Sequence, residues 1–266
     1  ELQMPQDHQR PEESTGEGSY VLTSLDDQLR SDIKAFATQE SCTVFHVLNT
    51  AIAVFLLGCS QQNDIVIGVP VANRRRKELE GIVGFFTNTI VNRLVLDPEK
   101  TFRDALAVVK QEMITNQDYQ DVPFDKVVEV VKPDRSMNKT PIFQVVTNFV
   151  QRDAEVMKVS SITLTPFDYG HNTAKYDLHF CFTDFTSLDM MLSIEYATDL
   201  YERTTIERWS ADLLTTLTQL ITQPASQVSE FFTSNPKDTT SHTEPEQEEA
   251  TSTLSEFMNN REEFLI

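Results

Sequence analysis

One stretch of this chain, residues 44–57, is apolar on nearly every face of a helix. A helix without a polar face cannot lie on a surface, so other elements of a larger structure have to enclose it. Thr43 stands directly before the stretch, and threonine is a preferred N-cap residue. The sequence therefore predicts a core helix that starts after Thr43.

A second stretch, Asp64–Val71, is a β-branched run that is too apolar to leave one face in water. Such runs are typical of strands in the middle of a layered sheet. Hydrophobic periodicity predicts the remaining elements. Further strands are expected over residues 89–96, 142–149, 161–167, 176–185 and 188–196, with a hairpin at 184–187. Helices are expected over 124–131 and after capping patterns at Ser24, Thr101 and Thr204, the last two ending near residues 115 and 221.

This order of elements predicts a mixed α/β layered fold, α+β in arrangement, because it lacks the strict βαβ alternation of a doubly wound sheet. Residues 1–18 hold prolines and glycines among polar residues and are expected to form an extended arm that is ordered by docking. The main domain should cover residues 19–232. Residues 233–266 have the Glu-, Ser- and Thr-rich composition of an acidic linker, whose end forms either a short helix or a tail ordered only against a partner.

The charge balance argues against nucleic acid as a partner. The sequence has 41 acidic residues against 22 lysines and arginines, a formal net charge of −19, which opposes binding to phosphate backbones. No run approaches the roughly 18 apolar residues of a spanning helix, so membrane insertion is not expected. The first residue is not methionine, which suggests an excised piece. The widely spaced Cys42, Cys59 and Cys181 are expected to be buried free thiols in a reducing cytoplasm.

A search for catalytic groups finds none with a partner at the right spacing. His46 falls in the predicted core helix, His171 in a loop and His179 on a strand, without a nearby nucleophile or metal-ligand pattern. Asn88, Asn92 and Arg93 instead stand out as polar residues in a segment that looks buried, residues 84–93. Buried polar groups must be hydrogen-bonded. Two interpretations stay open: a turn capped by asparagine with an arginine–carboxylate pair, or the wall of a substrate channel.

Six segments, in order, resemble the core motifs of nonribosomal peptide synthetase condensation domains. Residues 81–93 (GIVGFFTNTIVNR) resemble IGxFxNTxxxR, residues 116–125 (NQDYQDVPFD) resemble HQDxPFE, and residues 133–145 (PDRSMNKTPIFQV) resemble RDxSRxPLFQV. Residues 64–74, 174–178 and 5–11 also fit, the last as the PxDxxRP arm. The resemblance covers about residues 2–231 and corresponds to the C-terminal lobe of such a domain. Asn116 departs from the usual histidine, Gln120 and Asp121 are extra, and residues 137–140 differ from the arginine-containing pattern.

The resemblance implies one lobe of a chloramphenicol acetyltransferase-like fold, in which two α/β lobes enclose a tunnel. Donor and acceptor peptidyl carrier proteins present their substrates on 4'-phosphopantetheine arms, and the acceptor amine attacks the donor thioester to form an amide. The HHxxxDG motif that manages this step belongs to the N-terminal lobe and should precede the arm. This chain is therefore expected to be catalytically incomplete alone, with no cofactor bound covalently, and to work with that lobe and possibly a following adenylation domain.

By the same resemblance, Asn88, Ala72 and Asn73 would line the substrate tunnel, with the Asn88 amide near the reacting groups. Arg93 would be structural, holding a buried carboxylate or backbone carbonyls. Asp177 and Lys175 would fix the segment that bridges the lobes, although a salt bridge at a strand end explains them equally well. No catalytic residue and no metal ligand is assigned to this lobe.

Two other functions remain open. One is a non-catalytic module that docks carrier proteins, and the other is a fragment of an epimerisation or cyclisation domain. A detached lobe should also expose an apolar face and therefore self-associate.

Overall fold

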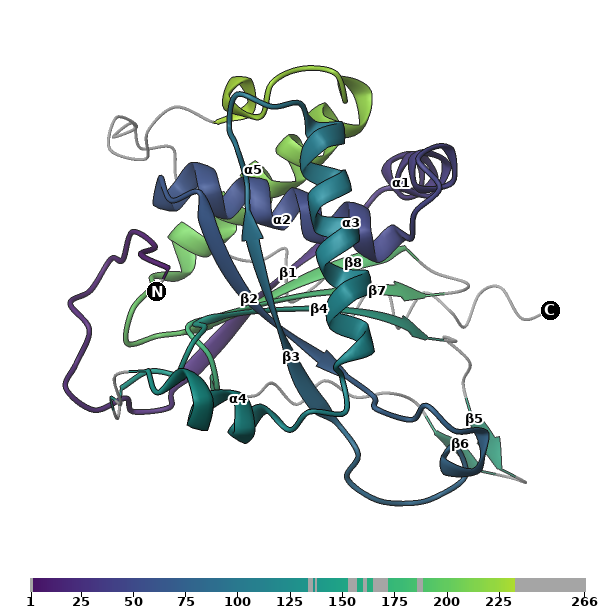
Figure 1. Ribbon diagram of the computed structural model, residues 1–266, viewed down its shortest axis with the longest axis vertical. Coiled ribbons are helices and arrows are strands. Elements are labelled where there is room, and N and C mark those ends of the chain that lie inside the picture. Colours follow the sequence, from purple (N-terminus) through teal and green to yellow (C-terminus); the bar gives the residue numbers. More distant parts are fainter. Residues whose placement is uncertain are drawn as a thin grey trace. The chain divides into compact units, whose positions relative to one another are not determined.

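The computed structural model describes residues 2–133, 136, 138–152, 172–185 and 189–232, and the backbone alone of 157–159 and 162–164. The predicted tail over residues 233–266, His171 and the hairpin positions 186 and 187 lie outside the described residues. Figure 1 shows how the helices and strands are arranged, coloured along the sequence.

The centre of the fold is a six-stranded sheet with the order β1-β8-β7-β4-β2-β3. Its strands are β1 (Gly18–Leu25), β2 (Asp64–Val71), β3 (Asn88–Val95), β4 (Val145–Arg152), β7 (Leu178–Phe185) and β8 (Met190–Ala197). The β2–β4 and β4–β7 pairs are parallel, and the other pairs are antiparallel. A separate pair, β5 (Met157–Val159) and β6 (Ile162–Leu164), is antiparallel. The predicted mixed α/β sheet is therefore present.

Strands β2 and β4 pair with each other over only a short stretch of the sheet. These strands pair only at Ile67 with Val145 and at Gly68 with Val146, whereas β4 and β7 pair along eight residues. Gly68 is required at this junction because a Cβ there would lie 2.4 Å from the ring of Phe143. The ring of Phe143, just before β4, thus packs directly against the backbone of β2 at Gly68.

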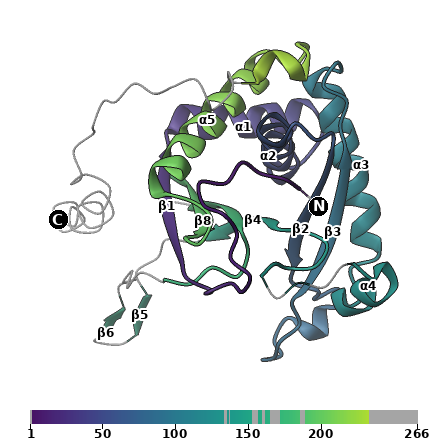
Figure 2. The ribbon, with the colours of Figure 1, turned by 90° about the vertical axis from the view of Figure 1, so that its left-hand side faces the viewer.

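The helices are α1 (Asp27–Gln39), α2 (Val44–Ser60), α3 (Phe102–Asp118), α4 (Phe124–Val131) and α5 (Arg203–Thr222), with short 3-10 turns η1 (Lys77–Leu79) and η2 (Val228–Phe231). Helix α2 is buried continuously from Val47 to Leu57, as its apolar sequence predicts, and Thr43 caps it. Figure 2 shows α2 between α1, α5 and α3. Along β7, the buried Leu178, Phe180 and Phe182 alternate with partly exposed residues, so the helices cover one face of the sheet.

The helix predicted to begin at Ser24 starts later. Residues 18–25 form the edge strand β1, paired along its whole length with β8, and the N-cap of α1 is Asp26, whose side chain accepts a hydrogen bond from Leu29 N. The Ser24 hydroxyl instead donates to Asp189 at 3.1 Å. The capping pattern could not reveal this because the strand depends on pairing with β8, far along the sequence.

The start of the last helix also differs from the prediction. Helix α5 begins at Arg203, and its N-cap residue Glu202 makes no side-chain capping bond. The arm supplies the missing acceptor, since the carboxylate of Asp7 accepts from Glu202 N at 2.9 Å and from the Thr205 hydroxyl at 3.0 Å. A carboxylate at a helix N-terminus is favoured by the exposed N–H groups there. Asp7 thereby fixes the arm to α5.

Two predicted strands have different bounds in the structure. The strand predicted over residues 142–149 is β4 at 145–152, and the strand predicted over 161–167 is described only as the three-residue β6, with β5 not foreseen. Within the described residues no single helix is long and apolar enough to cross a membrane, although the bent pair α1 and α2 passes that test by length and composition.

Candidate functional site

The side chain of Asn88, at the start of β3, is committed to the backbone of a neighbouring loop. Its amide donates to the carbonyl oxygens of Gln120 at 2.8 Å and Val122 at 2.7 Å, and its oxygen accepts from Phe124 N at 3.2 Å. Both amide hydrogens are therefore used within the protein. Asn88 joins the segment that resembles IGxFxNTxxxR to the one that resembles HQDxPFE.

Ala72 and Asn73 lie in the loop that follows β2, whose last residue Val71 pairs with Asn88. Ala72 is exposed, and Asn73 adopts a left-handed conformation with φ of 51°. The Asn73 side-chain oxygen is buried without a hydrogen-bond partner among the described residues. The structure thus brings the three predicted tunnel residues to the same end of the β2–β3 pair.

Arg74 holds the long loop between β2 and β3 in place. Its guanidinium donates to the carbonyl oxygen of Leu79 and, at 3.4 Å, to that of Gly84, and it lies 4.3 Å from the centre of the Phe86 ring. The loop nevertheless presents apolar side chains to solvent, because Val83 is 100% and Phe85 is 92% exposed. The expectation that this segment is buried is therefore wrong before Asn88.

Further along β3 the same expectation is correct for one residue. Asn92 is 2% exposed, and its side-chain oxygen accepts a hydrogen bond of 2.8 Å from the amide of Asn116. Asn116 is the residue that departs from the histidine of the family motif. Here its amide ties α3 to β3.

Arg93 pairs with a carboxylate, but on the surface. Its guanidinium donates to both oxygens of Asp64 at 2.7 to 3.1 Å, across the β2–β3 pair. The two side chains are 69% and 46% exposed, so the buried carboxylate expected for Arg93 is not there. The hydrogen bonds from Arg93 lower the pKa of Asp64 from its usual value. The outward position of Arg93 follows from the strand period, since its neighbours Asn92 and Leu94 point inward.

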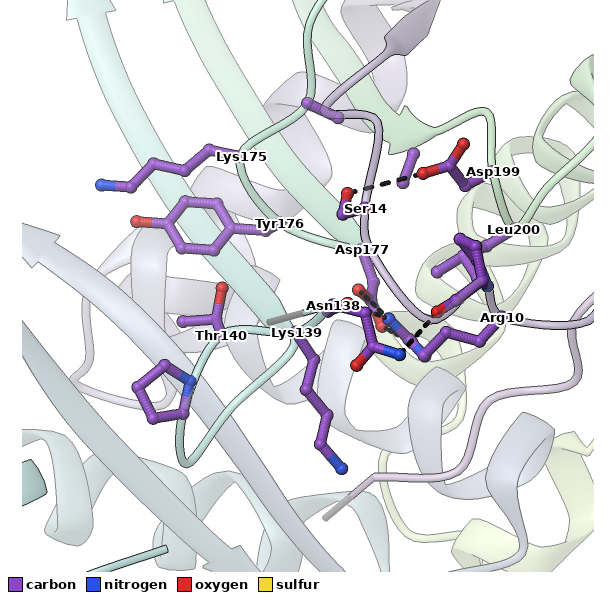
Figure 3. A pocket seen from close by; sticks show the side chains of 14 residues that line it. Arg10, Ser14, Asn138, Lys139, Thr140, Lys175, Tyr176, Asp177, Asp199 and Leu200 are labelled. Carbon is purple, nitrogen blue, oxygen red and sulfur yellow. Dashed lines mark hydrogen bonds and ion pairs between the residues drawn. The ribbon is translucent and has the colours of Figure 1, made fainter. Parts of the chain in front are cut away.

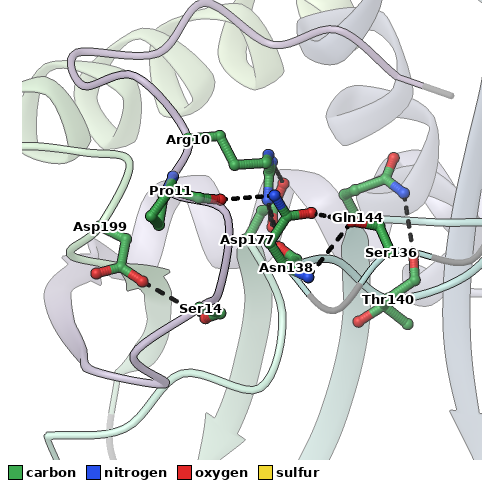
Figure 4. A network of polar contacts seen from close by, with 9 residues as sticks. All are labelled: Arg10, Pro11, Ser14, Ser136, Asn138, Thr140, Gln144, Asp177 and Asp199. Carbon is green, nitrogen blue, oxygen red and sulfur yellow. Dashed lines mark hydrogen bonds and ion pairs between the residues drawn. The ribbon is translucent and has the colours of Figure 1, made fainter.

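Asp177, directly before β7, forms an ion pair with Arg10 of the arm. The Arg10 guanidinium donates to both carboxylate oxygens and also to the carbonyl oxygen of Asn138 at 3.0 Å. The Asn138 amide donates to the carbonyl oxygen of Pro11 at 2.6 Å (Figure 4). Sequence reasoning did not foresee this pairing. The only sequence signal for it was the arginine of the PxDxxRP pattern, which is Arg10. The aspartate of the same pattern is Asp7.

Lys175 does not lie against Asp177. Its ammonium nitrogen sits 5.2 Å from the centre of the Tyr176 ring, a cation–π arrangement. The salt bridge expected at this strand end therefore joins Asp177 to Arg10, and Lys175 takes no part in it. Both residues border a pocket of about 260 Å³ where the arm crosses the loops before β4 and β7 (Figure 3).

The histidines and cysteines show no catalytic arrangement in the described part of the chain. The His46 side chain accepts a hydrogen bond from Thr43 N at 3.1 Å, and burial lowers the pKa of His46. Burial raises the pKa of Cys59 to about 12, which keeps the thiol protonated. Among the described residues no group of three or more His, Cys, Asp or Glu could hold a metal ion.

Comparison of the fold with solved structures identifies its class. The chain matches a four-domain nonribosomal peptide synthetase, holo-AB3403, with a TM-score of 0.76 and 20% identity over 85% of this chain and 18% of that one. It also matches the X-domain in complex with OxyB from teicoplanin biosynthesis, with a TM-score of 0.77 and 23% identity over 87% of this chain and 51% of that one. The fold is one lobe of the chloramphenicol acetyltransferase-like fold.

The sequence comparison adds the family. The family model described as Condensation domain matches residues 1–241. Chondramide synthase cmdD of Chondromyces crocatus is 34% identical over 86% of this chain, and malpinin synthetase of Mortierella alpina is 34% identical over 78%. The chain belongs to the condensation domain family of nonribosomal peptide synthetases. It spans only 6% and 3% of the length of those two relatives, and about half of the X-domain chain.

Proposed function

We propose that this chain is the C-terminal lobe of a condensation domain and works in amide-bond formation between a donor and an acceptor, each held as a thioester on a carrier protein. The observation that carries the proposal is the family match over residues 1–241, joined to coverage of about half of a solved domain of the same fold. The sequence contains no two adjacent histidines. The HHxxxDG motif is therefore not part of this chain, and the lobe is catalytically incomplete alone.

In this proposal the lobe supplies one wall of the tunnel. Asn88 acts as a positioning residue, because its amide is bound to the backbone of the loop at residues 120–124 rather than directed to a substrate. Ala72 and Asn73 follow β2 at the same end of the β2–β3 pair, where Val71 pairs with Asn88, and the exposed Ala72 faces the space that the proposal assigns to the tunnel. The reacting amine and its proton are managed by the other lobe.

The partners follow from the same proposal. They are the N-terminal lobe, the donor and acceptor carrier proteins with their 4'-phosphopantetheine arms, and an adenylation domain. The reaction takes place in the cytoplasm. No cofactor is bound covalently to the lobe itself.

The test is a condensation assay read by mass spectrometry, with aminoacyl-loaded donor and acceptor carrier proteins. It is run on this chain alone, on a separately expressed N-terminal lobe alone, and on both together. Product only with both lobes supports the proposal. Product from this chain alone would overturn it, because a catalytic group would then lie within these 266 residues, and His171 would be the first to replace.

A non-catalytic docking function is favoured by one observation, the fixed loop that exposes Val83 and Phe85. An exposed apolar surface of this kind is typical of an interaction site. Binding of a carrier protein to the chain, measured without any product in the two-lobe assay, would support this second function over the first.

A further inference from the structure

Ile142, just before β4, has a backbone conformation that β-branched residues rarely adopt. Its φ is 73°, in the left-handed region. The N–H of Phe143 donates to the carbonyl oxygen of Pro141 at 2.9 Å, and this bond closes a γ-turn centred on Ile142. A γ-turn with positive φ is rare and strained, and a β-branched side chain makes it a genuine outlier. Such strain persists only where the surrounding structure enforces it, and it is concentrated at functional sites.

Buried hydrogen bonds of Gln144 hold this turn closed. The Gln144 side-chain amide donates to the carbonyl oxygen of Thr140 at 3.2 Å, so the bond runs back across the turn (Figure 4). The carbonyl oxygen of Gln144 accepts from Leu178 N at 3.3 Å, which joins the turn to the start of β7. Gln144 is only 4% exposed, so water does not compete for these bonds. The turn is therefore not free to relax.

The turn sets the direction of one large side chain, that of Phe143. This side chain is buried, and its ring centre lies 5.3 Å from that of Phe124 at the start of α4 and 5.9 Å from that of Tyr176. On another side the ring packs against Gly68 of β2, where an added Cβ would collide with it. The surroundings therefore accept the Phe143 ring in one orientation.

The Phe143 ring is connected to Asn88 through Phe124. The ring of Phe124 packs against that of Phe143, and the N–H of Phe124 donates to the side-chain oxygen of Asn88 at 3.2 Å. A shift of the Phe143 ring would therefore reach Asn88 through one packed ring and one hydrogen bond. Asn88 lies at the end of the β2–β3 pair that the proposed function assigns to the tunnel wall.

We propose that Ile142 is a positioning residue for the condensation reaction, because its strained turn fixes the Phe143 ring and thereby holds Phe124 and Asn88 at the tunnel wall. This inference rests on the proposed function and deepens it. A residue with a Cβ is confined to a small region at positive φ, whereas glycine moves freely there. Glycine in place of Ile142 should therefore relieve the strain and loosen the wall at the same time.

The experiment compares Ile142→Gly with Ile142→Ala in the full chain. Both substitutions remove the branched side chain, but alanine keeps the Cβ that confines φ. Urea unfolding should find Ile142→Gly more stable than Ile142→Ala, the reverse of the usual order for these two residues. Hydrogen exchange at Phe124 N, followed by NMR, should be about fivefold faster in Ile142→Gly.

Turnover should follow the opposite order to stability. In the two-lobe assay we expect kcat to be about tenfold lower for Ile142→Gly than for Ile142→Ala, because the wall is held less precisely. KM for the loaded carrier proteins should be the same for both variants, since neither substitution touches a surface that docks them. A residue with a structural role alone would not raise stability and lower kcat together.

Ser41→Gly is the matched control. Ser41 also has a positive φ, 50°, and it is exposed. Its N–H donates to Thr38 O and its carbonyl oxygen accepts from Lys110, and both backbone bonds survive the substitution. Ser41→Gly should raise stability and leave exchange at Phe124 N and turnover unchanged. Should Ile142→Gly fail to fold, Phe143→Leu keeps the turn, removes the ring and should speed exchange at Phe124 N in the same way.

Two results would overturn the proposal. Equal exchange at Phe124 N in Ile142→Gly and Ile142→Ala would show that the turn does not hold Phe124. Lower stability together with lower kcat in Ile142→Gly than in Ile142→Ala would leave Ile142 a structural role alone. The exchange measurement needs no product. If the two natural lobes together form none, the proposed function fails, while faster exchange in Ile142→Gly would still show that the turn holds Phe124.

Discussion

The side-chain amide of Asn88 donates a hydrogen bond of 2.7 Å to the carbonyl oxygen of Val122. This contact holds the loop before α4 against the start of β3, and Phe124 N completes it by donating to the oxygen of the same side chain. Two segments that resemble separate family motifs therefore form one structural unit.

Replacing Asn88 by alanine should lower the stability of the lobe. Three hydrogen bonds are lost and two backbone carbonyls are left without their partner, at a cost of roughly 2–3 kcal/mol. Urea unfolding followed by circular dichroism measures the change, and Asn63→Ala serves as the control, because Asn63 is exposed and bonds to Leu96 N through its backbone carbonyl, which the substitution keeps. Unchanged stability together with lost activity in the two-lobe assay would instead assign Asn88 to the substrate.

The Arg10–Asp177 pair should contribute more to stability than a surface pair. The two side chains are 19% and 12% exposed, so Asp177→Asn removes the carboxylate from a largely buried guanidinium and should cost roughly 2–4 kcal/mol. A double-mutant cycle with Arg10→Met isolates the coupling between the two residues. Arg93→Gln, which breaks the exposed pair with Asp64, is expected to cost much less. Equal losses of unfolding free energy on breaking either pair would contradict this prediction.

His46 should make stability depend on pH. Its folded-state pKa lies below the ordinary value of 6.5 because of burial, so the unfolded chain takes up the proton first as the pH falls. Stability is then full above 6.5 and decreases below it, as the protonated ring can no longer accept from Thr43 N. In His46→Gln, the unfolding midpoints at pH 7 and pH 5 should lie closer together than they do in the natural protein. The exposed His8→Gln is the control, and a His46→Gln protein with the natural pH dependence would refute the explanation.

Cys59 should resist alkylation in the folded protein. With a pKa raised to about 12 by burial, about one thiol in ten thousand is ionised at pH 8, and the thiolate is the reactive form. Labelling with iodoacetamide followed by peptide mass spectrometry should modify Cys59 only after unfolding. Cys42, whose side chain is less buried, is expected to react first. Native labelling of Cys59 at the rate of Cys42 would show that the thiol is accessible.

Segments whose own side chains decide their surroundings could be predicted from the sequence. Helix α2 is enclosed because its apolar residues leave it no polar face, and β2 is interior for the same reason. Strand β1 was missed because an edge strand takes its structure from the partner strand, and its own sequence also permits the start of a helix. The segment before Asn88 was predicted to be buried because it is apolar. Composition alone does not show which apolar residues have neighbours that cover them.

The sequence by itself determined the layered α/β class, the core helix and the family resemblance, since periodicity and motif order are properties of one continuous stretch at a time. Only the tertiary structure decided which polar groups meet. Asp7 reaches Glu202 and Arg10 reaches Asp177 across more than half of the chain, and many other carboxylates were equally suitable by type. The choice depends on which strand and helix ends lie next to the arm, because hydrogen bonds and ion pairs act only over a few ångströms.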